Sequence, residues 1–135
     1  MEVPPDVILY PEFHLVVWKP QGMLKEKTVN RVIRFLAHEE ARSEKAFNRF
    51  SDTTRLETVE LNFRYVFHVA IYRRLTYSGR PSAKSAFLVD DRKAAHYFKL
   101  HALLTDHSSL RVRTFARRSA AARWLGLPIE FLSRT

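Results

Sequence analysis

The 135-residue sequence contains no cysteine, and its three glycines stand far apart. The lack of cysteine excludes disulfides, thiolate metal sites and cysteine nucleophiles. Isolated glycines do not form the phosphate-binding loops of P-loop or dinucleotide-binding proteins, because those loops need clustered glycines for close backbone approach to phosphate. The Gly-x-Ser-x-Gly elbow of serine hydrolases is also missing. These absences argue against nucleotide hydrolysis and serine hydrolysis, and we expect no cofactor.

Long apolar runs are absent too. The longest, such as residues 15–18 and 86–89, are much shorter than a membrane span. The opening Met-Glu-Val-Pro-Pro-Asp lacks the basic and apolar regions of a signal peptide. Together with the missing cysteines, these features predict a soluble cytoplasmic protein.

Apolar residues are plentiful, and basic residues are concentrated in one half of the chain. The hydrophobic fraction is 46% and the aromatic fraction 13%, which suffices for the core of one domain spanning residues 1–135. The net charge is +9, yet residues 1–60 hold nine bases and ten acids, whereas residues 61–135 hold fourteen bases and four acids. Such asymmetry favours a basic face that attracts anionic partners, or it serves solubility alone.

Two short strands open the predicted fold, over residues 7–10 and 14–18. A helix follows from an N-cap at Thr28 to about residue 42, because apolar residues recur there at spacings of three and four. A further strand is predicted over residues 46–50.

A second helix is predicted from Asn62 to the breaker segment 78–81. A continuous apolar run over residues 85–89 then indicates a strand buried on both faces, which we expect at the centre of the sheet. The core face of the helix is expected to carry Phe63, Val66, Phe67, Ala70 and Ile71.

The last third of the chain predicts two more helices and one more strand. Asp90 or Asp91 would cap a third helix. Residues 110–115 alternate and predict a strand with one wet face, and a last helix over residues 119–125 ends at Gly126. The apolar stripe of the third helix is expected to hold Tyr97, Leu100 and Leu104, broadened by Ala94 and Phe98.

The predicted order of elements is ββαβαβαβα. Strands that alternate with helices require right-handed crossovers and a sheet covered by helices on at least one face. We therefore predict a compact α/β sandwich with a mixed sheet of about five strands.

Four segments carry a resemblance to a known family. They are the strand that begins Leu15-Val16-Val17, the strand end Phe50-Ser51-Asp52, residues 83–91 with their Asp-Asp pair, and the closing segment from Val112-Arg113-Thr114-Phe115 to Ala121-Ala122-Arg123-Trp124-Leu125-Gly126. In these segments the sequence resembles the SpoIIAA-like proteins, bacterial single-domain relatives of the STAS fold. The resemblance implies a STAS-like sandwich that binds or regulates, and a distant similarity to lipid-binding folds of the Sec14 type.

The resemblance also implies a regulatory hydroxyl just past the strand that ends near Phe50. Sporulation-type STAS proteins place a regulatory serine there, and the corresponding residues here are Ser51, Asp52, Thr53 and Thr54. A phosphate at this place would gain from a helix N-terminus or repel an acidic partner. The same residue types are the usual ones for turns and caps, so the cluster is either a phospho-switch or an ordinary loop opening.

Arginines near the last helix form a candidate anion-binding cluster. Two of them stand at the start of that helix, where the helix dipole disfavours positive charge. The cluster would hold a phosphate or carboxylate, or its side chains would simply extend into water. Its members are Arg111, Arg113, Arg117, Arg118 and Arg123.

We expect no metal site. Helix capping explains the Asp90-Asp91 pair, and His96 and His101 are five residues apart on different helix faces. Arginines interleave with aromatic residues in segments such as 113–117, as in stacking platforms for nucleic acid, but we rank nucleic acid below other partners.

Two functional interpretations stay open. The leading one is a non-catalytic STAS-like module that binds a protein partner or a small anionic ligand. The alternative is a lipid- or hydrophobic-ligand-binding domain of the same fold, with a groove between the second helix and the sheet. A well-packed core favours the first and a continuous apolar cavity favours the second. Exposed edge strands would also allow a homodimer.

Overall fold

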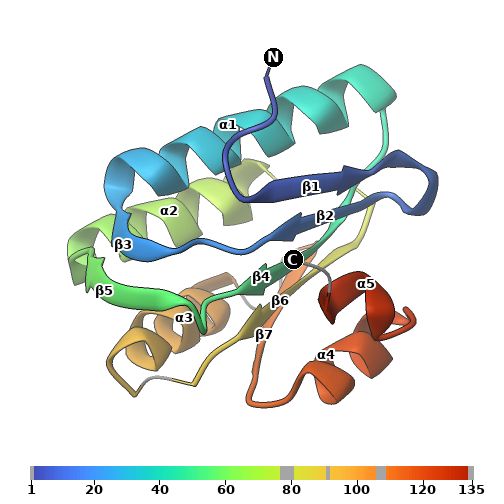
Figure 1. Cartoon of the computed structure of the whole chain (residues 1–135). Helices are drawn as coiled ribbons and strands as arrows, with labels where there is room; N and C mark the ends of the chain where they lie inside the picture. Colours follow the sequence, from blue (N-terminus) through green and yellow to red (C-terminus); the bar gives the residue numbers. More distant parts are fainter. Residues whose placement is uncertain (1, 77–80, 91, 106–108, 134–135) are drawn as a thin grey trace.

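A five-stranded mixed sheet lies at the centre of the molecule (Figure 1). The computed structural model describes residues 2–76, 81–90, 92–105 and 109–133. β1 is antiparallel to β2, and the other neighbouring strands are parallel. The predicted α/β sandwich with a mixed sheet of about five strands is confirmed. In spatial order the strands are β1 (Val7–Tyr10), β2 (Leu15–Trp18), β4 (Asn48–Asp52), β6 (Ala83–Leu88) and β7 (Leu110–Phe115).

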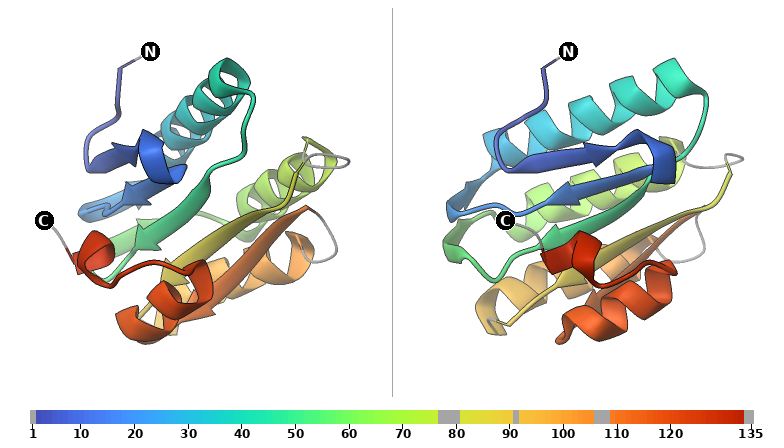
Figure 2. Two further views of the ribbon diagram at one scale, coloured as in Figure 1. Left: turned by 90° about the vertical axis from the view of Figure 1, so that its right-hand side faces the viewer. Right: turned by 45° about the vertical axis from the view of Figure 1, so that its right-hand side comes forward.

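Helices cover both faces of this sheet (Figure 2). Three of them link parallel strands and lie on one face: α1 (Glu26–Ser43), α2 (Phe63–Thr76) and α3 (Arg92–Thr105). The other face carries α4 (Arg118–Leu125) and the short α5 (Glu130–Ser133). No helix in the described part of the chain is long and apolar enough to cross a lipid bilayer.

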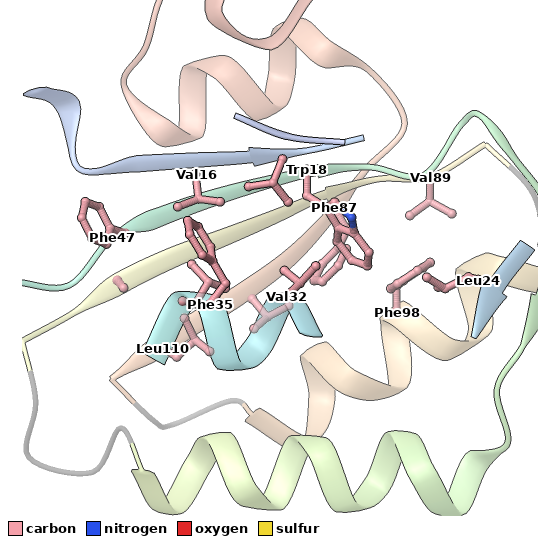
Figure 3. Close-up of a cluster of buried hydrophobic side chains, with 14 residues drawn as sticks. Val16, Trp18, Leu24, Val32, Phe35, Phe47, Phe87, Val89, Phe98 and Leu110 are labelled. Carbon is pink, nitrogen blue, oxygen red and sulfur yellow. The ribbon is translucent and has the colours of Figure 1, made fainter. Parts of the chain in front are cut away.

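Strand alternation divides the core into two clusters. Val16 points toward the α1–α3 side, where it joins Phe35 of α1 and Phe98 of α3 (Figure 3). Its neighbour Val17 points to the other side and packs in the cluster that holds Leu125 of α4. Each face of the sheet therefore has its own apolar layer.

Several short elements were not predicted from the sequence. β3 (Gly22–Lys25) and β5 (Leu56–Glu60) pair in parallel as a separate two-stranded sheet, and the 3-10 helix η1 (Pro11–Phe13) connects β1 to β2. Gly22 has a φ of 70°, and the register of the small sheet shifts directly after it. These strands are too short to show a clear apolar period, which is why the pattern missed them.

Several predicted boundaries are wrong. The strand predicted over residues 46–50 starts at Asn48, and the strand predicted over residues 85–89 is β6 at Ala83–Leu88. α1 starts at Glu26 rather than after a cap at Thr28, because β3 leads straight into the helix through the extended residue Lys25. β4 continues through Ser51 and Asp52, which pair with β6, so these residues end a strand rather than open a loop. The strand predicted at the centre, β6, is an interior strand next to the middle one, β4.

The predicted core face of α2 is also partly wrong. Phe63 and Phe67 are exposed, whereas Val66, Ala70 and Arg73 are buried. The helix is turned because it packs beside α3, where Phe63 stacks on Tyr97 with ring centroids 5.0 Å apart.

The buried face of α3 differs in a similar way from the predicted stripe. Phe98, His101 and Thr105 are buried, whereas Tyr97 and Leu100 are only half-buried. Asp91, residues 78–80 and the side chains of Ala94 and Leu104 lie outside the described residues.

Most predictions for the C-terminal part agree with the structure, but the short helix α5 was not predicted. In β7, Arg111 and Arg113 are exposed while Leu110 and Val112 are buried, as the alternation indicated. α4 ends at Gly126, which has a φ of 72° and whose amide donates to carbonyl groups of the last helical turn.

Candidate functional site

An apolar cavity of about 70 Å³ lies between the sheet and helices α1, α2 and α3. Side chains from all three helices and from β2, β4 and β6 line it. The apolar lining includes Trp18, Leu24, Val32, Phe87 and Phe98, whose side chains are seen in Figure 3. The helix-to-sheet space named by the sequence analysis is therefore not completely filled.

An open groove of about 360 Å³ adjoins this cavity between α1 and α2. The cavity and the groove share four lining residues: Ile33, Leu36, Arg49 and Arg73. Sites for small organic ligands usually occupy ~300–1,000 Å³, so the two spaces together have a suitable size. The groove therefore lies directly beside the cavity, with these four side chains between the two spaces.

Polar side chains gather on the sheet side of the cavity. Arg49 and Ser51 are two residues apart in β4, so both point to the α1–α3 face. Ser85 of β6 lies in register with Arg49. Arg73 comes from α2 and His101 from α3. All five residues are buried, so an apolar space ends in a small polar region.

Arg49 is held by a buried ion pair with α1. Its Nη2 donates to Oε1 of Glu40 at 2.9 Å, and both side chains are about 95% buried. Oε2 of Glu40 accepts the backbone N–H of Phe47 at 2.9 Å. The guanidinium group is therefore fixed in position before any ligand arrives.

His101 lies deep between α3 and the sheet. Burial, together with the positive charges of Arg73 and Arg49, lowers the pKa of His101 to about 3. The imidazole is neutral at physiological pH. Its Nδ1 atom has no hydrogen-bond partner among the residues that the structure describes. A buried polar atom of this kind is a natural contact point for a ligand.

Tyr65 of α2 links this helix to α1 beside the cavity. Its hydroxyl donates to Oδ1 of Asn30 at 2.6 Å and lies 3.2 Å from the carbonyl oxygen of Glu26. Burial raises the pKa of Tyr65 to about 12, so this hydroxyl keeps its proton. The contact joins α1 and α2 at one end of the cavity.

The structure separates the residues of the expected phospho-switch. Ser51 is buried and lines the cavity, whereas Asp52 points to the opposite face of the sheet toward α4. The buried Thr53 hydroxyl donates to the carbonyl oxygen of Leu88 at 2.6 Å. Thr54, which is half-buried, donates from its hydroxyl (2.6 Å) and its amide (3.0 Å) to Oδ1 of Asp52. A switch at these residues stays a prediction.

Asp52 forms an ion pair with Arg118 at the start of α4. Burial alone would raise the pKa of Asp52, but the hydrogen bonds from Thr54 and Arg118 outweigh it and lower the pKa. Burial lowers the pKa of the neighbouring Lys19, with the charges of Arg118 and Arg55 acting in the same direction and Asp52 opposing. This ionic group ties β4 to α4.

The expected anion-binding arginines do not all gather at one point. Arg118 is turned to Asp52, and the guanidinium of Arg113 lies 5.3 Å from the centre of the Trp124 ring. Arg111, Arg117 and Arg123 are exposed on the α4 side. Anion binding by this cluster stays a prediction.

Most polar residues of the cavity were not predicted as a site. Arg49 and Arg73 were not singled out, and His101 was considered only for metal binding. The one available signal was the spacing of Arg49, which shares a strand face with Phe47 and Ser51, since a charged residue on a buried strand face needs a partner.

The architecture is that of a SpoIIAA-like α/β sandwich, and this fold agrees with the resemblance found in the sequence. A solved structure with this fold is an uncharacterised protein of the DUF3478 family from Shewanella loihica PV-4. The similarity has a TM-score of 0.57 at 12% identity and covers 88% of this chain and 90% of that one. No family model matches the sequence, and no curated protein matches it either.

Proposed function

We propose that this chain is a non-catalytic binding module of SpoIIAA-like fold whose ligand is a small amphiphilic anion. The observation that carries the proposal is the apolar cavity that ends at Arg49, Arg73 and His101. It favours the hydrophobic-ligand alternative over a module that acts only through a protein partner, and it also accommodates an anionic group.

The apolar walls would hold the tail of the ligand. They are formed by aliphatic and aromatic side chains from three helices and the sheet, such as Leu24, Val32 and Phe98. A chain that leaves water for this space gains roughly 0.8 kcal/mol for each buried CH₂ group. The groove between α1 and α2 gives the tail room beyond the enclosed part.

The polar end would hold the acidic head. A guanidinium group offers several N–H donors in a planar fork that matches a carboxylate, and Arg49 and Arg73 both line the cavity and the groove. The hydroxyl groups of Ser51 and Ser85 lie on the same side. The neutral His101 adds a further polar contact.

Calorimetric titration with decanoate tests this function. Decanol has the same tail without the charge, and acetate has the charge without the tail, so decanoate should bind more tightly than either. The Arg73→Gln variant should bind decanoate roughly tenfold more weakly, as expected for one lost charge-assisted contact. The matched control is Arg64→Gln, an exposed arginine of the same helix, which should bind like the unchanged protein.

A second variant tests the cavity independently, in case Arg73→Gln does not fold. Val69→Phe places a larger side chain at the half-buried lining of the cavity and should weaken decanoate and decanol alike. Decanoate binding that neither variant weakens would overturn the proposal, as would equal affinity for decanoate and acetate.

A further inference from the structure

The outer side of the α2–α3 pair exposes several large apolar side chains. In α2, Phe63 is 57% exposed, Phe67 47% and Leu75 71%, and in α3 Leu103 is 72% exposed. A single exposed apolar residue is ordinary on a protein surface, but a group on two adjacent helices is not.

These side chains lie on neighbouring helices. α2 and α3 pack side by side on the same face of the sheet (Figure 1). Phe63 stacks on Tyr97 across their contact. Phe67 follows Phe63 by about one helical turn, so the two rings lie on the same side of α2. Leu103 lies about two turns past Tyr97 on α3. We call this surface, with the exposed Arg64 and Lys99, the α2–α3 face.

The described exposed charges of the α2–α3 face have one sign, since Arg64 and Lys99 are both basic. The sequences of the two helices hold six lysines and arginines, of which Arg73 is buried, and no acidic residue. The exposed side chains of Arg64 and Lys99 stand among the apolar ones, together with His68 and His96. α1 on the same side of the sheet differs, since it includes Glu26, Glu39 and Glu40.

We propose that the α2–α3 face docks on the surface of an anionic lipid bilayer. Exposed phenylalanine and leucine side chains enter the headgroup region of a bilayer, and the basic residues around them are attracted to anionic lipids. This combination complements a bilayer surface better than a folded acidic protein, because Phe63, Phe67, Leu75 and Leu103 are widely exposed and none of them lines the cavity or the groove described above. The proposal is independent of the ligand in the cavity.

Co-sedimentation with lipid vesicles tests the proposal. The purified protein should bind vesicles that contain phosphatidylglycerol and phosphatidylcholine, and should stay in solution with phosphatidylcholine alone. Raising the salt concentration from low to 0.5 M should weaken the binding, because the Debye length falls to about 4 Å. Absence of sedimentation with the anionic vesicles at low salt would overturn the proposal.

A double variant in α2 and a matched control test whether the α2–α3 face is the surface that binds vesicles. Phe63→Ser combined with Phe67→Ser should lower the partition coefficient at least roughly tenfold, since two rings no longer leave water. The matched control is Ile129→Ser, another exposed apolar residue, next to α5 on the opposite side of the sheet. Equal binding by the double variant and the control would contradict docking through the α2–α3 face.

Charge variants provide the independent check. Arg64→Glu with Lys99→Glu should reduce vesicle binding about 25-fold or more, from ~1 kcal/mol for each basic group lost at the membrane surface. Arg111→Glu with Arg123→Glu changes the net charge equally on the α4 side and should reduce binding much less. An equal loss in both double variants would show attraction by net charge only and would overturn the assignment of this face.

Discussion

At the residue scale, the polar groups of the cavity differ in how they tolerate burial. Arg49 keeps its charge beside the carboxylate of Glu40, which compensates part of the cost of leaving water. His101 has two positively charged neighbours instead, Arg73 and Arg49, and it remains neutral. The same cavity therefore stabilises negative charge and disfavours additional positive charge.

The neutral state of His101 makes folding stability depend on pH. The pKa of His101 is about 3 in the folded protein and 6.5 in the unfolded chain, so between these values only the unfolded chain binds the proton. The free energy of unfolding should fall as the pH decreases from 6.5 toward 3, by about 1.4 kcal/mol per pH unit from this residue. Asp52 does not contribute in the upper part of this window, because its lowered pKa places its effect below 3.8.

Urea unfolding at pH 7 and pH 5 measures this dependence. The unchanged protein should lose about 2 kcal/mol between the two values on account of His101. His101→Gln, which does not titrate, should lose correspondingly less, and the exposed His38→Gln should behave like the unchanged protein. An unaltered pH dependence in His101→Gln would contradict a buried neutral imidazole.

The positions of single residues were harder to predict than the elements that hold them. Alternation predicted the outward arginines of β7, because apolar and basic residues alternate along this strand and the apolar ones face the core. It gave no role to Arg49, since this buried arginine depends on a partner on another element, Glu40 of the preceding helix α1. Contacts of this kind appear only once the chain is folded.

At the element scale, α4 is held to the sheet by more than its apolar face. Ala121 and Leu125 pack on β4 and β6, while Arg118 in the first turn pairs with Asp52 at the end of β4. Lys84 of β6 adds a third link, since its Nζ donates to the carbonyl oxygen of Trp124 at 2.8 Å. The positive charge that opposes the helix dipole is thereby matched by a buried carboxylate.

Removal of Arg118 should therefore destabilise the fold. Asp52 has no exposed surface, so Arg118→Ala leaves a buried carboxylate without its cation. We expect a loss of about 2 kcal/mol, less than for a fully buried pair because the Arg118 side chain is 36% exposed. Arg117→Ala, an exposed neighbour, should cost under ~0.5 kcal/mol.

Chemical denaturation of the two variants measures the difference. The double variant Asp52→Asn with Arg118→Ala should recover part of the loss, because the buried carboxylate that lost its ion pair is then neutral. A cost for Arg118→Ala no larger than that for Arg117→Ala would contradict a structural role of the pair.

Helices were predicted correctly where a long apolar period marks them. The buried face was predicted wrongly where the packing of one helix on another determines which side chains are covered. α1 and α4 were placed within about three residues of their actual ends. The face of α2 was misassigned because α2 leans on α3, which exposes Phe63 and Phe67 and buries Arg73. The apolar period of α2 alone does not show which of its side chains face α3.

At the scale of the whole molecule, the two layers of the sandwich differ. The α4 side is closely packed around Phe50 and Leu132, both fully buried. The α1–α3 side keeps a cavity with a polar end and an exposed apolar, basic outer surface. We assign both proposed binding activities to this second layer, one inside it and one on its outer side.

Nuclear magnetic resonance titration with decanoate tests whether an amphiphilic anion binds in the cavity, because backbone amide shifts report where a ligand binds. We predict saturable shifts centred on Val69, Ser85 and His101, which line the cavity on three different elements. Shifts centred on Arg111, Arg117 and Arg123 would place the anion on the α4 side instead and contradict the account. Absence of any shift up to millimolar decanoate would contradict it as well.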